Sequence, residues 1–236
     1  MHAKVAPRDI VTDTDMDIED AIRLSLGSAF DWPVIGEERG GEIPSDGAYW
    51  LVDPICGTRN FALEIPLFSV NLALVEAGEP TVAVVGDGSS RDTLLAEVGN
   101  GVWSTADGHL GQLSTSSASS VVDFEAWPKA GAERDRAAAA LASVVAADRW
   151  DVRCLSTTLA LAYVARGRMA GCVMFDTPGP EHTTAGVLLV REAGGRVTDV
   201  SGKDWSLGSV GIVASAGDET HEELFGFWAA QDIERD

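Results

Sequence analysis

The spacing of hydrophobic and polar residues predicts one helix followed by a run of strands in the first half of the chain. Residues 16–30 repeat apolar positions at helical spacing, and Asp15 is predicted to cap this helix. Short apolar runs separated by Gly and Asp turns follow at 33–36, 48–53, 67–78, 81–87 and 93–104. These runs predict the strands of one sheet, which ends in a meander.

The second half of the chain alternates between the two periodicities. Helices are predicted at 131–148, 157–167, 182–195 and 219–230, and strands at 151–155, 171–175, 196–200 and 210–216. Between the halves, the small polar stretch SSASS at 116–120 is the best candidate for a boundary. The chain is therefore predicted to be an α/β protein with two sub-domains, 1–120 and 121–236.

Charge and cysteine content narrow the class of protein. The net charge of −20 argues against nucleic acid and anionic membranes as partners, because like charges repel. No apolar run approaches the roughly 20 residues that span a bilayer, and residues 1–9 lack the features of a signal peptide, so a cytoplasmic location is expected. Three widely spaced cysteines indicate reduced thiols, and Cys154 and Cys172 are predicted to lie in the core.

Acidic residues follow apolar strands or open helices in separate segments. These segments are VTDTDMDIE (11–19), VIGEE (34–38) and WLVDPICGT (50–58), and a fourth, PEHTTAGVLLVREAGGRVTD (180–199), opens a helix with His182. Two acids at such strand ends, Glu38 and Asp53, favour a cation site over solvated loop positions. Their oxygen ligands suit Mg²⁺ or Ca²⁺.

In this order and spacing the four segments resemble the inositol monophosphatase family of metal-dependent sugar-phosphate phosphatases. The resemblance covers nearly the whole chain and implies a layered α-β-α-β-α fold. It also implies two or three Mg²⁺ ions and a small phosphorylated substrate. By this resemblance the metal ligands are Glu38, Asp53 and the Ile55 carbonyl, and the phosphate-binding turn is formed by Gly57 and Thr58. The resemblance also implies that Asp15 pairs with Thr58 to activate water, and that Lys4 is the family's basic N-terminal residue.

Two positions depart from the family pattern. Cys56 stands where the second acid of the Asp-Pro-Ile-Asp-Gly-Thr motif belongs, and Glu181-His182 replaces Trp-Asp in a later motif. Both lost carboxylates are expected to hold the same ion, so the change is paired. It predicts that Cys56 and His182 lie together in the vacated position.

Four hypotheses follow from this pairing. In the first, the protein catalyses acyl-transfer, thioester or cyclisation chemistry on a small molecule, with Cys56 as the nucleophile and His182 as its general base. Asp53 or Glu181 would orient the imidazole ring, and the amides of the 57–58 turn would donate to the oxyanion. The turn is expected to lower the thiol pKa, and the helix start to keep the imidazole neutral. In the second, the ligands Glu38, Asp53, Cys56 and His182 surround one softer ion, because thiolate and imidazole select Zn²⁺ or Fe²⁺ over Mg²⁺.

The third hypothesis is a phosphomonoesterase with a reduced Mg²⁺ site, and the fourth is a catalytically silent binding or scaffold protein. No cofactor is fixed by the sequence beyond one possible Mg²⁺, or Zn²⁺ under the second hypothesis. The family's customary first helix is expected to be absent, since the chain begins about where the second element begins. A homodimer would cover the face that this leaves exposed.

Overall fold

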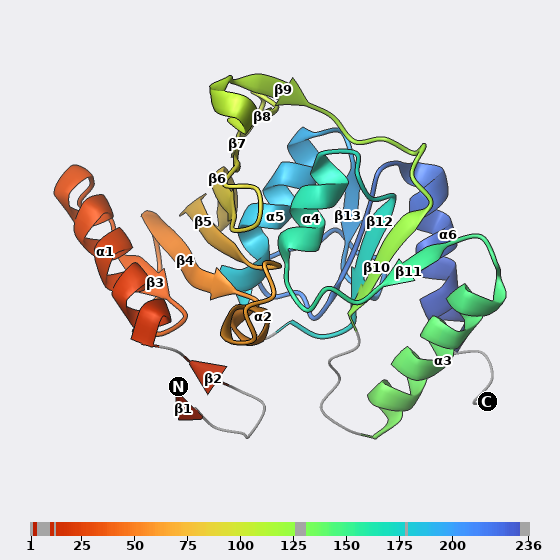
Figure 1. Cartoon of the computed structure of the whole chain (residues 1–236). Helices are drawn as coiled ribbons and strands as arrows, with labels where there is room; N and C mark the ends of the chain where they lie inside the picture. The colour runs from red at the N-terminus through yellow and green to blue at the C-terminus, as the bar shows by residue number, and fades with distance from the viewer. Residues whose placement is uncertain (1, 4–9, 12, 126–130, 178, 232–236) are drawn as a thin grey trace.

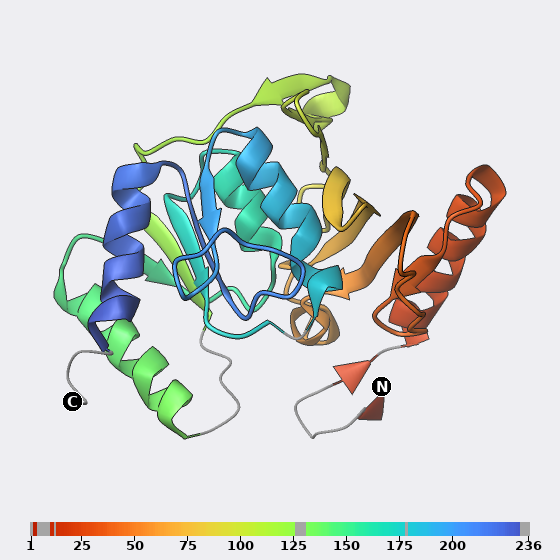
Figure 2. The ribbon, with the colours of Figure 1, turned by 180° about the vertical axis from the view of Figure 1, so that it is seen from behind.

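The protein is a layered α/β molecule, and a computed structural model describes residues 2–3, 10–11, 13–125, 131–177 and 179–231. Five layers follow one another across Figure 1: a helix, a seven-stranded sheet, a central pair of helices, a five-stranded sheet and an outer pair of helices. The reverse view in Figure 2 shows the same order. The predicted α-β-α-β-α architecture is confirmed.

The first sheet has the strand order β3-β4-β5-β6-β7-β8-β9. Strand β3 runs parallel to β4, and every later neighbouring pair is antiparallel, as expected for strands joined by short turns. The strands are β3 (Val34–Gly36), β4 (Ala48–Cys56), β5 (Ser69–Glu76), β6 (Glu79–Asp87), β7 (Thr93–Glu97), β8 (Val102–Ser104) and β9 (Gly111–Leu113).

The second sheet has the order β11-β10-β12-β14-β13. Strand β10 is parallel to both of its neighbours, whereas β14 is antiparallel to β12 and β13. The strands are β10 (Val121–Glu125), β11 (Asp151–Arg153), β12 (Gly171–Met174), β13 (Arg196–Thr198) and β14 (Ile212–Ser215). A separate pair, β1 (His2–Ala3) and β2 (Ile10–Val11), lies near the N-terminus.

The helices separate and cover the sheets. They are α1 (Asp13–Ala29), α2 (Thr58–Ala62), α3 (Ala132–Ala146), α4 (Leu159–Ala165), α5 (Pro180–Glu192) and α6 (Asp218–Ala229), with a 3₁₀ turn at Ala106–Gly108. Helix α1 packs on β3 and β4, α4 and α5 lie between the sheets, and α3 packs with α6 beyond the second sheet. No helix in the described ranges is both long and apolar enough to cross a bilayer.

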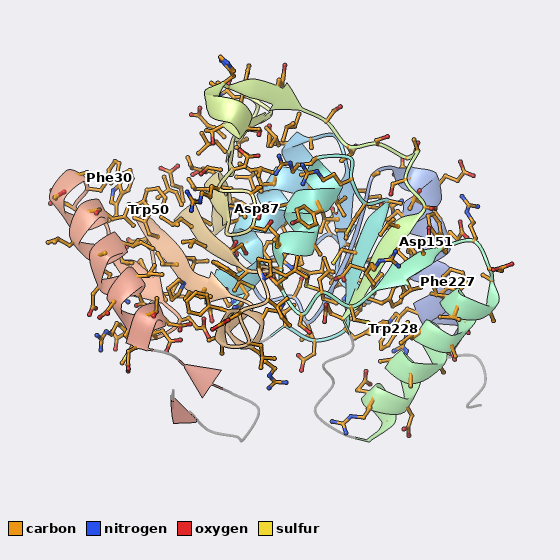
Figure 3. All side chains as sticks on the ribbon, in the orientation of Figure 1. Phe30, Trp50, Asp87, Asp151, Phe227 and Trp228 are labelled. Atoms are coloured by element: carbon orange, nitrogen blue, oxygen red, sulfur yellow. The ribbon has the colours of Figure 1, made fainter. Side chains whose placement is uncertain are left out.

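The main core lies between the two sheets and contains residues from both, around α4 and α5. Smaller clusters form under the outer helices, where Figure 3 shows Trp50 near α1 and Trp228 near α3. The change from one sheet to the other falls between Leu113 and Val121, next to the predicted boundary. Since the main core joins both sheets, the division into 1–120 and 121–236 stays a prediction.

Two local predictions are wrong. Helix α1 begins at Asp13, so Asp15 is a fully buried residue of the first turn and not its cap. Cys154 is exposed, because it follows the short edge strand β11, while Cys172 on the central strand β12 is buried as predicted.

Candidate active site

A bulge in β4 brings Asp53 and Cys56 to the same side of the first sheet. Two residues three positions apart on a regular strand point to opposite faces. In β4, Asp53 pairs with Asn71 but Cys56 pairs with Ser69, so β4 carries one extra residue in this interval. The bulge contains Pro54, which cannot donate a ladder hydrogen bond. Both side chains consequently reach the cluster beside α5.

The turn after Cys56 requires a glycine. Gly57 has φ 99° and precedes the short helix α2. A Cβ at this position would lie 2.9 Å from the Leu67 carbonyl oxygen and 3.1 Å from Thr157 Cβ, so a side chain would have to displace backbone. The Thr58 hydroxyl donates to the Ile55 carbonyl at 3.0 Å, which closes the turn.

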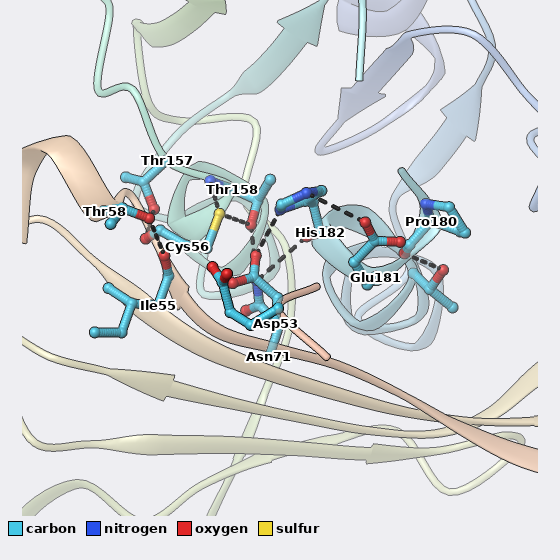
Figure 4. Close-up of polar contacts among 12 residues, drawn as sticks. Asp53, Ile55, Cys56, Thr58, Asn71, Thr157, Thr158, Pro180, Glu181 and His182 are labelled. Atoms are coloured by element: carbon cyan, nitrogen blue, oxygen red, sulfur yellow. Dashed lines mark hydrogen bonds and ion pairs between the residues drawn. The ribbon is translucent and has the colours of Figure 1, made fainter. Parts of the chain in front are cut away.

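Helix α5 supplies His182 from its first turn. His182 Nδ1 lies 2.7 Å from Asp53 Oδ2, and its Nε2 lies 3.4 Å from Glu181 Oε1 (Figure 4). The structure thus brings Cys56 and His182 together, as the sequence predicted, and places Asp53 beside them. One ligand atom of each of these three residues lies within 4.8 Å of the other two. Of the two proposed orienting acids, Asp53 makes the closer contact with the ring.

The thiol of Cys56 is enclosed by the start of α4. Its Sγ lies 2.9 Å from Thr158 Oγ1 and accepts a hydrogen bond from the Thr158 amide at 3.2 Å. Asn71 Nδ2 donates to Thr158 Oγ1 and to the His182 carbonyl, so one amide links both sides of the cluster (Figure 4). The Thr157 hydroxyl donates to the Cys56 carbonyl. Cys56 is only 6% exposed.

Asp53 has unused bonding capacity. The residue is fully buried, and its Oδ1 has no hydrogen-bond partner among the described residues, whereas its Oδ2 contacts His182. A buried carboxylate oxygen without a partner is costly. An oxygen of this kind suits a cation ligand.

The predicted pKa directions for the cysteine and histidine are wrong. Burial raises the pKa of the Cys56 thiol, and the nearby Asp53 charge raises it further, against the smaller effect of His182. Burial alone would lower the pKa of His182, but the contacts with Asp53 and Cys56 outweigh it and leave that pKa well above its ordinary range. Local charge and burial therefore favour a neutral thiol beside an imidazolium.

The other predicted residues lie outside this cluster. Glu38 is half-buried, and its amide donates to the buried Glu19 carboxylate. Its neighbour Glu37 donates its amide to the Val52 carbonyl, next to Asp53, and has a buried carboxylate oxygen. The Thr58 hydroxyl donates to the Ile55 carbonyl, and the pairing of Asp15 with Thr58 stays a prediction. Lys4 lies outside the described residues.

Asn71 is a site residue that the sequence interpretation overlooked. A usable signal was present: an amide stands at an inward position of the apolar strand β5 and is 2% exposed. Buried amides of this kind are normally held by hydrogen bonds. Those bonds connect Asn71 to the segments that carry Thr158 and His182.

Comparison with known proteins places the chain in a family. The model of the inositol monophosphatase family matches residues 2–231. An inositol-1-monophosphatase ImpA of Mycolicibacterium smegmatis is 32% identical over 222 residues, covering 92% of this chain and 79% of that protein. A histidinol-phosphatase of Mycobacterium tuberculosis is 33% identical over 204 residues, covering 81% of this chain and 75% of that protein.

The fold agrees with a solved relative. The Thermotoga maritima IMPase superposes with a TM-score of 0.83 at 30% identity, covering 98% of this chain and 87% of that one. The protein therefore belongs to the inositol monophosphatase family, and the two relatives from mycobacteria carry the names of phosphatases. These relatives support the phosphomonoesterase hypothesis better than the acyl-transfer hypothesis.

Proposed function

We propose that this protein is a cation-dependent phosphomonoesterase that acts on a small hydroxylated molecule. The observation that carries the proposal is the fully buried Asp53, whose Oδ1 lacks a hydrogen-bond partner in the described structure. Asp53 is also the position that the family resemblance assigns to a metal ligand. Relatives named for phosphates of inositol and histidinol support a small phosphorylated substrate.

The residues around Asp53 fit a divalent cation with oxygen ligands. Asp53 Oδ1 and the Ile55 carbonyl supply two of them, and the turn after β3 supplies an acid. We assign that acid to Glu37 ahead of the predicted Glu38, because the Glu37 amide bonds to Val52 and one of its carboxylate oxygens is buried. A bound divalent cation would supply charge stabilisation for phosphoryl oxygens and a more acidic water.

The protein's own residues position the phosphate. Gly57 adopts a backbone conformation that a side chain would not fit, so the chain can approach a bound group closely. The hydrogen bond from Thr58 to Ile55 keeps this turn attached to β4, directly after Asp53. The phosphate would accordingly lie between the 57–58 turn and the carboxylate of Asp53.

The acyl-transfer hypothesis has less support. A thiolate is the nucleophilic form of cysteine. The pKa of Cys56 is raised by burial and by Asp53, which disfavours that form. His182 has its Nδ1 on Asp53 and is favoured as imidazolium, so it is poorly suited to accept the thiol proton.

Restoring the two family carboxylates tests the proposal. In Cys56→Asp/His182→Asp, Mg²⁺-dependent phosphate release from inositol 1-phosphate or histidinol phosphate should rise at least about tenfold, because a second hard ion could then stabilise the leaving oxygen. The exposed Cys154→Asp is the matched control and should leave the rate unchanged. If the double variant folds and binds Mg²⁺ yet releases no phosphate from either ester, the proposal is wrong.

A further inference from the structure

We infer that Asp53, Cys56 and His182 form a binding site for one thiophilic divalent cation, such as Zn²⁺, that keeps an open coordination position. Their three ligand atoms lie within 4.8 Å of one another. A tetrahedral zinc ion with bonds of about 2.0–2.3 Å would separate its ligands by roughly 3.5 Å. Small side-chain movements would therefore suffice. The inference rests on the proposed function for the role of the ion, but not for its binding.

The donor set selects the kind of ion. Mg²⁺ takes oxygen ligands in near-octahedral geometry, and a thiol and an imidazole offer none. Thiolate and imidazole together favour Zn²⁺ and its transition-metal neighbours. The replacement of two family acids by Cys56 and His182 therefore retains a metal site at this position but changes its preferred ion from Mg²⁺ to a thiophilic ion such as Zn²⁺.

Contacts behind the three ligands support this assignment. Metal-bound histidines usually donate their second ring nitrogen to a carboxylate. With His182 Nδ1 facing the cluster, Nε2 lies 3.4 Å from Glu181 Oε1. The Thr158 amide donates to Cys56 Sγ at 3.2 Å, and the same bond would stabilise a thiolate. Each side of the cluster thus has an outer partner suited to a bound ion.

Charge and protons balance when the ion binds. The bond from Cys56 Sγ to the metal replaces the thiol proton, the bond from His182 Nδ1 replaces its proton, and both protons pass to solvent. One thiolate and one carboxylate then offset the charge of a divalent ion in a buried place. Asp53 contributes Oδ2, the oxygen that now faces His182. Its Oδ1 remains for the cation of the proposed function.

The direct test is the metal content of the full chain. Protein stripped with a chelator is dialysed against equal concentrations of Zn²⁺ and Mg²⁺, desalted and measured by plasma mass spectrometry. The wild type and the exposed-thiol control Cys154→Ser should retain about one Zn²⁺ per chain, as a three-ligand site predicts. Cys56→Ser should retain less than a tenth as much. Glu181→Gln, which keeps all three ligands, should weaken zinc binding about 10–100-fold.

Cobalt provides a second readout that reports the thiolate itself. Loading with Co²⁺ should give a sulfur-to-cobalt charge-transfer band in the wild type and in Cys154→Ser, and no such band in Cys56→Ser. Thermal unfolding checks that each variant folds. If Cys56→Ser does not fold, the inference is tested instead by zinc retention in Glu181→Gln and His182→Asn, both of which should retain less zinc than the wild type. The inference is overturned if the wild type retains no zinc, or if folded Cys56→Ser, Glu181→Gln and His182→Asn bind zinc as tightly as the wild type.

Failure of this inference can be told apart from failure of the proposed function. Phosphate release with Mg²⁺ by a protein that retains no zinc would overturn the soft-metal site alone. Zinc binding that is lost in Cys56→Ser, without phosphate release under any cation, would overturn the phosphatase proposal and leave the metal site in place.

Discussion

Two groups of buried acids in this protein use their oxygens differently. Asp87 and Asp92 lie beside Arg166, whose Nη2 contacts Asp92 and whose Nη1 lies 3.8 Å from Asp87, which is labelled in Figure 3. Both oxygens of each of these acids accept hydrogen bonds from neighbouring side chains or amides. Asp53 contacts His182 through one oxygen, and the other has no partner among the described residues.

The comparison separates a structural carboxylate from a binding one. In the Arg166 group both acids have partners on each of their oxygens, although Arg166 Nη1 itself is buried without a hydrogen bond in the described part of the chain, and the ion pair links the end of α4 to the connection between β6 and β7. The Asp53 group is incomplete, and its partner His182 can lose its proton whereas an arginine cannot. Burial and negative charge are common to both groups, so the unfilled oxygen and the removable proton distinguish them.

The largest expected effect comes from Asp53→Asn. Neutralising this residue removes the proposed cation ligand, so cation-dependent phosphate release should fall at least about 100-fold, a loss typical of a major electrostatic group. Stability should change by less than about 1.5 kcal/mol, because His182 can become neutral and leave no unpaired buried charge. Phosphate assays and urea unfolding measure the two effects. A stable Asp53→Asn protein with full activity would contradict the proposed site.

Asp92→Asn should show the opposite pattern. Arg166 keeps its charge in a buried position, so unfolding free energy should fall by about 3–5 kcal/mol. Activity per folded molecule and cation affinity should stay near wild type, because Asp92 lies in the β6–β7 hairpin connection and bonds to Arg166 and Ser104. Urea unfolding at constant pH measures the loss. A large change in cation affinity with unchanged stability would erase the distinction between the groups.

A smaller effect is expected at His221, a buried histidine outside both groups. Burial, with a contribution from Arg196, lowers its pKa to about 4, and it bonds to Thr198 and Ser215. The unfolded chain binds this proton near pH 6.5, so the stability contribution is complete above that pH and is lost as pH falls toward 4. The expected loss is about 1–2 kcal/mol, after allowance for screening.

His221→Gln supplies the control for that pH dependence. In urea titrations at a series of pH values between 6.5 and 4, this variant should lack the part of the pH dependence of the unfolding free energy that His221 contributes, because glutamine does not titrate. An unchanged slope would mean that other groups cause the acid destabilisation.

Sequence patterns predicted the order of most helices and strands, because alternation and helical spacing report which residues face a core. They also paired Cys56 with His182 across 125 intervening positions, through the family motifs that each interrupts. They could not predict the bulge in β4, because the extra residue is defined only by how β4 pairs with β5. The pKa directions failed for a similar reason: burial and the contact with Asp53 outweigh the local helix and turn effects.

The most direct test of the central claim is phosphate release by the unaltered protein before and after chelation. With inositol 1-phosphate or histidinol phosphate, release should rise on addition of Mg²⁺, alone or with Zn²⁺, and fall to the uncatalysed rate with excess chelator. Hydrolysis that resists chelation and disappears in Cys56→Ala would contradict the account, because it would make the thiol, and not a cation at Asp53, the centre of the chemistry.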